Sequence, residues 1–255
     1  MIDWLSLAPV WESAAVLFTV FMTLSLSVLW VLFHVGKSWK IEISPGLFTP
    51  VSMTFGLIIG FMASQVWSDN SRAMSAVMRE ASAVKTIIAI SEALPEKQRS
   101  EIEGLVRDYV DHVVNVDWPA MQSPSSHQGM IDNSSRNALK YTLLITPQNA
   151  TQTSAQSQLL TAFNALYESR SERLIFSGTS VNPLKWALVS TFALILIIVT
   201  SLVHRSGARN ALIALSLLSC ALTLSFLLIL THDRPFAGYV SITPDLLIRA
   251  LPDTR

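Results

Sequence analysis

Four stretches of this sequence consist of apolar and small polar residues without a charge. They run over Ser13–Phe33, Leu47–Val66, Trp186–Val203 and Ala211–Thr231. Each approaches the roughly 20 residues that a helix needs to cross the hydrocarbon core of a bilayer. The first is not a cleaved signal peptide, because the residues before it include Asp3 but neither lysine nor arginine. The pattern predicts an all-α membrane protein with four transmembrane helices.

The stretch between the second and third spans is polar but keeps a helical periodicity. Apolar positions step by three and four residues at Met74, Val77, Ala81, Val84 and Ile88. No glycine or proline interrupts the chain between Gly60 and Pro95. We therefore expect one helix over Thr49–Ala93, about 65 Å long at 1.5 Å per residue. Such a helix would serve both the membrane part and a soluble part.

The rest of the insert also reads as helical. A second helix is expected from Pro95 to Trp118–Pro119, followed by a polar loop over Gln122–Asn133. Further helices are expected over Ser135–Thr146 and Thr153–Phe176. In the tail, Thr243 or Asp245 could cap a short helix that begins near Pro244. The predicted parts are residues 1–66 (two spans), 67–183 (helical soluble insert), 184–231 (two spans) and 232–255 (a tail docked on the insert).

Composition removes several classes of function. Charged residues make up 14% of the chain, and the 18 basic and 18 acidic residues cancel, so no nucleic-acid partner is indicated. One cysteine, and histidines without a paired spacing, give no metal site. Nucleophile motifs and phosphate-binding glycine loops are missing from the sequence, so we expect neither an enzyme nor a bound cofactor.

The second span carries the most informative pattern. Small residues recur every four positions at Ser52, Gly56, Gly60 and Ser64. Small residues let helix backbones approach closely in a membrane, so this face packs either within the chain or against neighbouring subunits. In the second case a pore could be narrowed by hydrophobic side chains that gate by dewetting. The candidates for lining or gating that pore are Met53, Leu57, Ile58, Phe61 and Ser64.

The four predicted spans hold no charged residue in their interiors. A proton- or ion-coupled transporter usually keeps an ionisable residue inside a span, so its absence from the sequence favours a passive pore. Just beyond the second span, Asn70, Arg72 and Arg79 could attract anions. The alternative is that the arginines are solvated or paired with Asp69 or Glu80.

Several motifs in this order resemble the bestrophin-like family of bacterial four-span membrane proteins. They are Phe55–Phe61 (FGLIIGF), Val66–Arg72 (VWSDNSR), Arg79–Ala81, Leu94–Pro95, Trp118–Pro119, Arg170–Leu174 (RSERL) and a tail motif of Asp233, Arg234, Pro235, Phe236 and Gly238. The name implies a distant similarity to bestrophins, which are pentameric anion channels whose second span lines the pore. The acidic cluster that binds calcium in animal bestrophins is missing here, with only Asp245 and Asp253 downstream.

The resemblance implies a homo-oligomeric, pentameric ion channel in the bacterial inner membrane, conducting anions such as chloride. The rival hypothesis is a non-conducting scaffold or sensor whose insert binds a partner protein or ligand. Four spans place the insert and both termini on one side of the membrane. The short connections hold four Lys/Arg, which favours a periplasmic insert by the positive-inside rule. The resemblance favours a cytosolic insert, and we follow it.

Overall fold

The fold was analysed in a computed structural model that describes residues 8–34, 46, 48–122, 133–178, 180–204 and 207–252. These residues form helices and connecting turns, without a strand among them. Four helices are long and apolar enough to cross a membrane: α2 (Val10–His34), α3 (Phe48–Ser91), α8 (Pro183–Val203) and α9 (Ala208–His232). The predicted all-α class with four spanning helices is confirmed. The chain divides into two compact units, which we describe separately.

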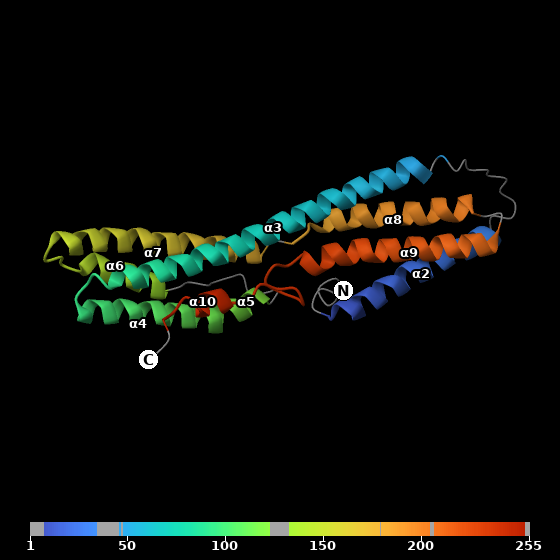
Figure 1. Ribbon diagram of the computed structural model, residues 1–255. Coiled ribbons are helices and arrows are strands. Elements are labelled where there is room, and N and C mark those ends of the chain that lie inside the picture. Colours follow the sequence, from blue (N-terminus) through green and yellow to red (C-terminus); the bar gives the residue numbers. More distant parts are fainter. Residues whose placement is uncertain are drawn as a thin grey trace. The chain divides into compact units, whose positions relative to one another are not determined.

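The membrane unit comprises residues 1–68 and 180–233. Helices α2, α8 and α9 pack against one another (Figure 1). The rings of Phe21 and Phe226 meet edge to face with centroids 5.0 Å apart. Ser25 and Ser219 share a buried hydrogen bond of 3.1 Å between their hydroxyls. Polar side chains that satisfy each other across two helices hold the pair together where no water can reach them.

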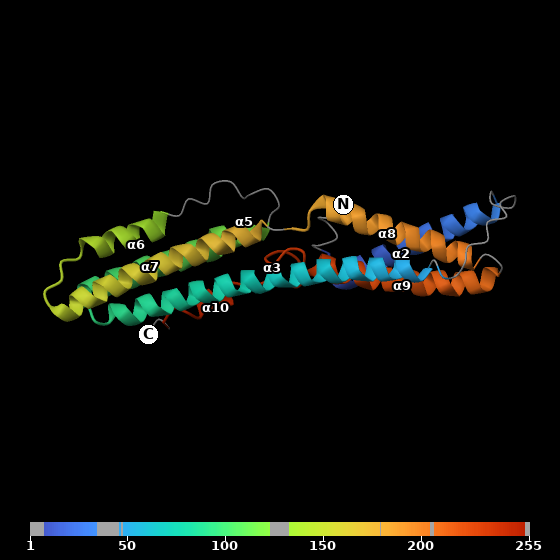
Figure 2. The same cartoon turned by 90° about the horizontal axis from the view of Figure 1, so that it is seen from above.

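The insert unit comprises residues 69–179 together with residues 234–255. Its helices are the later part of α3, α4 (Glu96–His112), α5 (Trp118–Gln122), α6 (Asn133–Leu144), α7 (Ala150–Ser177) and α10 (Asp245–Ile248). In Figure 2, α3 and α7 run alongside each other within this unit. One apolar core joins them, built from residues such as Val77, Ile87, Ile102, Leu159 and Leu166.

Helix α3 is continuous over 44 residues, which is about 66 Å at 1.5 Å per residue. The single helix predicted over Thr49–Ala93 is therefore present, with ends shifted by one and two residues. The break at Pro95 is also present, since this residue is the N-cap of α4. Proline ends one helix and starts the next because it has no N–H and fixes its own φ.

The expected helix end at Trp118–Pro119 is wrong. Residues Val113–Asp117 form a π-helical turn, labelled η3, and α5 continues from Trp118 to Gln122. The N–H of Trp118 donates to the carbonyl of Val113, five residues back. Pro119 follows as the second residue of α5, and because it has no N–H it cannot donate a helical hydrogen bond there.

The remaining boundaries differ by a few residues. Helix α6 lies two residues earlier than the predicted Ser135–Thr146 at both ends, and α7 begins three residues before Thr153. Asn149 sets the start of α7, because its side chain accepts a hydrogen bond from the N–H of Gln152 at 2.9 Å. Helix α10 has no side-chain cap, since Thr243 donates to the Asp245 carboxylate instead. The predicted loop over Gln122–Asn133 lies mostly outside the described residues, as do residues 35–45, 205–206 and Asp253.

Candidate pore helix and its charged extension

The membrane part of α3 has one packed face and one open face. Phe55, Met62 and Val66 are buried in the core of the membrane unit. On the opposite side, Met53, Leu57 and Phe61 are 77%, 59% and 68% exposed, and Ser64 is exposed beside them. Positions three, four and seven apart share one side of a helix, so the three apolar side chains and Ser64 form one continuous strip. We call Met53, Leu57, Phe61 and Ser64 the open face.

Ile58 does not belong to the open face. It is partly buried and packs against the membrane core, which follows from its position five residues after Met53, half a turn around the helix. Of the five predicted pore-lining or gating residues, four therefore share one exposed face and Ile58 lies away from it.

The small residues of α3 lie next to the open face. A Cβ added at Gly56 or at Gly60 would meet no atom within 4 Å. Ser52 is half-buried, and its hydroxyl donates back to the carbonyl of Phe48 at 2.7 Å. Packing of the two glycines inside one chain, one of the two alternatives above, is not what the described residues show.

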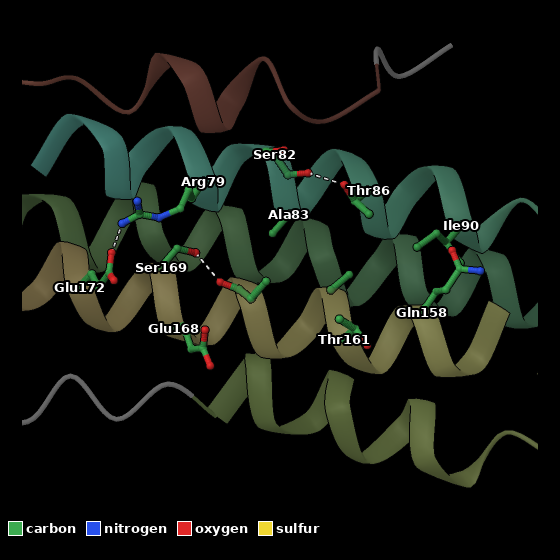
Figure 3. Close-up of a pocket in the computed structure, with 12 residues that line it drawn as sticks. Arg79, Ser82, Ala83, Thr86, Ile90, Gln158, Thr161, Glu168, Ser169 and Glu172 are labelled. Carbon is green, nitrogen blue, oxygen red and sulfur yellow. Dashed lines mark hydrogen bonds and ion pairs between the residues drawn. The ribbon is translucent and has the colours of Figure 1, made fainter. Parts of the chain in front are cut away.

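In the insert unit, Arg72 and Arg79 line one cavity of about 430 Å³. The cavity is completed by Ser71 and Ser75 of α3 and by Glu172, Ile175 and Phe176 of α7. Arg79 forms an ion pair with Glu172, seen in Figure 3, and not with Asp69 or Glu80 as the sequence had suggested. No ion pair to Arg72 is found within the described part of the chain. Glu172 belongs to the RSERL motif, but its pairing with Arg79 was not predicted, because the two residues lie 93 positions apart in the sequence.

Asn70 faces elsewhere. It lines a second cavity of about 330 Å³ with Met74, Leu246 and the tail residues 240–243. Its side-chain oxygen is buried there without a hydrogen-bond partner among the described residues. The three residues predicted to attract anions are thus not brought together, because only the two arginines share a cavity.

A buried ionic cluster holds the core of the insert and was missed in the sequence. Arg173 of α7 donates to the carboxylate of Glu80 from Nε at 2.6 Å and from Nη2 at 3.1 Å. Tyr109 of α4 donates its hydroxyl to the same carboxylate. Burial, followed by the charge of Glu80, holds the pKa of Tyr109 well above its usual value.

Asp117 completes this cluster. Arg170 donates to it from Nε at 2.9 Å and from Nη2 at 3.1 Å, and Arg173 adds a third bond of 3.0 Å. Burial alone would lower the pKa of Arg173, but Glu80, Tyr109 and Asp117 together outweigh burial and the pKa is raised. Two arginines face two carboxylates in this cluster, and the ring of His112 lies 3.7 Å from Asp117. The cluster ties α3 to α7 and η3. The i, i+3 spacing of Arg170 and Arg173 in an otherwise apolar stripe was the available signal.

The tail motif is structural. Asp233 accepts a hydrogen bond from the N–H of Val181 at 2.7 Å within the membrane unit. In the insert unit, Pro235 and Phe236 are buried, and the Phe236 ring meets Trp118 edge to face at 5.6 Å. Gly238 has φ of 99°, the left-handed region that other residues avoid. Arg234 is half-buried at the start of this turn.

Among the described residues, no group of three or more His, Cys, Asp or Glu side chains could hold a metal ion. The helices and their packing define a four-span helical membrane protein with an open face on its longest helix. The family model of the bestrophin-like domain matches residues 19–247, and the chain belongs to that family.

Solved structures share this fold. A point mutant of a bacterial bestrophin homologue from Klebsiella pneumoniae has a TM-score of 0.72 at 9% identity, covering 93% of this chain and 96% of its own. A second mutant of a bestrophin homologue from that organism has a TM-score of 0.71 at 9% identity, covering 96% of both chains. A crystal structure described as a membrane protein has a TM-score of 0.73 at 9% identity, covering 94% and 96%. A comparison with curated proteins found no match.

Proposed function

We propose that this protein is a homo-oligomeric ion channel in which α3 of each subunit lines the neck of the pore. The observation that carries the proposal is the open face of α3, with Met53, Leu57 and Phe61 exposed opposite a packed face. Membership of the bestrophin-like family and the shared fold with bestrophin homologues support a channel rather than an enzyme.

In an oligomer, both the glycines and the exposed apolar side chains of α3 would have a role. Open space at Gly56 and Gly60 accepts the backbone of a neighbouring subunit at close range. The apolar side chains beside the glycines then face the axis, where a ring of them holds back water and ions until it widens. The resemblance to bestrophins argues for five subunits.

We assign anions such as chloride as the permeant ions. Arg72 and Arg79 line a cavity in the insert whose net charge is positive, which would favour anions along the path of an ion that leaves the neck. We place the protein in the bacterial inner membrane, with the insert and both termini in the cytosol.

Two measurements test the proposal. The mass of the detergent-solubilised protein gives the number of subunits, and halide flux into liposomes shows conduction. Phe61→Ala widens the ring and is expected to raise flux severalfold. Phe18→Ala is the matched control, because Phe18 is an exposed phenylalanine on α2. A monomer, or no flux from any of the three proteins, contradicts the channel.

A further inference from the structure

The two arginines on the extension of α3 are not equivalent. They lie seven residues apart on one side of the helix and line the same cavity of about 430 Å³. If both were free, each subunit would present two positive charges to that cavity. The contacts of each arginine show that only one of them is free.

Arg79 is neutralised by Glu172. Nη2 of Arg79 pairs with Oε2 of Glu172, and the two side chains are 57% and 46% exposed, so the pair faces solvent. Both residues also line a neighbouring cavity of about 510 Å³ between α3 and α7 (Figure 3). The ion pair therefore lines both cavities, and its net charge is zero.

Arg72 keeps its charge. The structure gives it no ion pair within the described residues, and its neighbours in the cavity besides Arg79 and Glu172 are two serines, Ile175 and Phe176. The carboxylate of Glu80 is turned into the core and bonded by Arg173. The lining of the cavity thus carries two positive charges and one negative charge, a net charge of one.

We infer that Glu172 sets the ion selectivity of the channel by cancelling the charge of Arg79, which leaves Arg72 as the charge that attracts anions. The inference rests on the proposed channel function. A charged group beside an ion pathway raises the local concentration of the opposite ion. One unit charge about 10 Å from an ion in water changes that concentration about twofold, in opposite directions for anions and cations. The anion-to-cation permeability ratio should then change by about fourfold for a single charge, and by more for a substitution that changes one charge in every subunit.

The test uses the full-length protein in planar bilayers under a potassium chloride gradient, with the permeability ratio taken from the reversal potential. Glu172→Gln frees Arg79 in every subunit and is expected to raise the anion-to-cation ratio by at least about fourfold. Arg72→Gln is expected to lower it by a similar factor. The double variant Arg79→Gln/Glu172→Gln removes a neutral pair and is expected to keep the wild-type ratio.

Glu168→Gln is the matched control, because Glu168 lies one turn away on α7 and lines only the larger cavity. Its effect should be smaller than that of Glu172→Gln. An unchanged ratio for Glu172→Gln in a conducting channel, or a double variant that matches Arg79→Gln, overturns the inference and leaves the channel intact. A wild-type protein that does not conduct overturns the channel, and the inference with it. Unchanged subunit mass shows that each variant is assembled.

Discussion

Arg173 is the residue on which the core of the insert depends most. Its guanidinium is fully buried and bonds two carboxylates, Glu80 and Asp117, from two different elements. It also stacks over the ring of Trp118, 5.1 Å from the ring centre. Taking a charge out of water is costly, and the cost is offset only while every partner is in place. Losing one arginine leaves an excess negative charge in the core.

We therefore expect Arg173→Met to destabilise the insert by about 3–5 kcal/mol, the usual cost of removing one partner of a buried ion pair. Urea unfolding in detergent, followed by circular dichroism, measures the loss. Arg99→Met is the control. Among the described residues, Arg99 forms one partly exposed ion pair, with Glu103 one turn along α4, so its loss should change the unfolding midpoint little. Equal effects of the two substitutions would contradict a structural role for the cluster.

Tyr109 gives the cluster a dependence on alkaline pH. Burial and Glu80 raise its pKa in the folded state, while the phenol of an unfolded chain ionises near pH 10. Above about pH 10 the unfolded state releases a proton that the folded state keeps, so stability falls as the pH rises. Below that pH the contribution is constant.

Urea midpoints measured between pH 8 and about 11 should fall with pH more steeply for the wild type than for Tyr109→Phe, which has no phenol proton to lose. Tyr239→Phe serves as the control, because Tyr239 is exposed in the tail. It should follow the wild type. Parallel curves for the wild type and Tyr109→Phe would show that this hydroxyl does not titrate with unfolding.

At the scale of elements, the features that depend on local sequence pattern were predicted from the sequence. The length of α3 follows from 34 positions without glycine or proline between Gly60 and Pro95, and the four spans follow from missing charge. The passage through Pro119 was mispredicted, because a π turn depends on one shifted hydrogen bond that leaves no trace in composition. Pairings such as Arg79 with Glu172 could not be predicted, since they join side chains brought together only by tertiary packing.

The open side of α3 makes a prediction about assembly. Gly60 has free space around it in the single chain, so Gly60→Leu should leave each subunit folded while blocking the close approach of a neighbouring helix. We expect the variant to lose its oligomeric mass in detergent and to keep its helical content. Gly104→Leu is the matched control for Gly60→Leu. Gly104 lies inside α4, is exposed, and a Cβ added there would also meet no atom within 4 Å. An oligomer that survives Gly60→Leu places the subunit contact on another face.

At the scale of the whole molecule, the number of spans fixes which parts share a side of the membrane. With four crossing helices, the connection between α8 and α9 lies opposite the insert. The proposed orientation puts that connection in the periplasm and the insert in the cytosol. Charge alone argues the other way, because the short connections hold four Lys/Arg. That argument is weak, since basic residues also flank the spans on the insert side, namely Arg72, Arg79, Arg170, Arg173 and Lys185.

Single cysteines decide between the two orientations. Cys220 is the only cysteine, so Cys220→Ser gives a background without thiols. On that background Gly207→Cys marks the connection before α9, and Ser154→Cys marks an exposed position on α7. A membrane-impermeant maleimide added to spheroplasts should label the first variant at once and the second only after the membrane is permeabilised. The opposite order would place the arginine-lined cavity outside the cell. Arg72 would then attract anions at the periplasmic end of the channel and not at its cytosolic end.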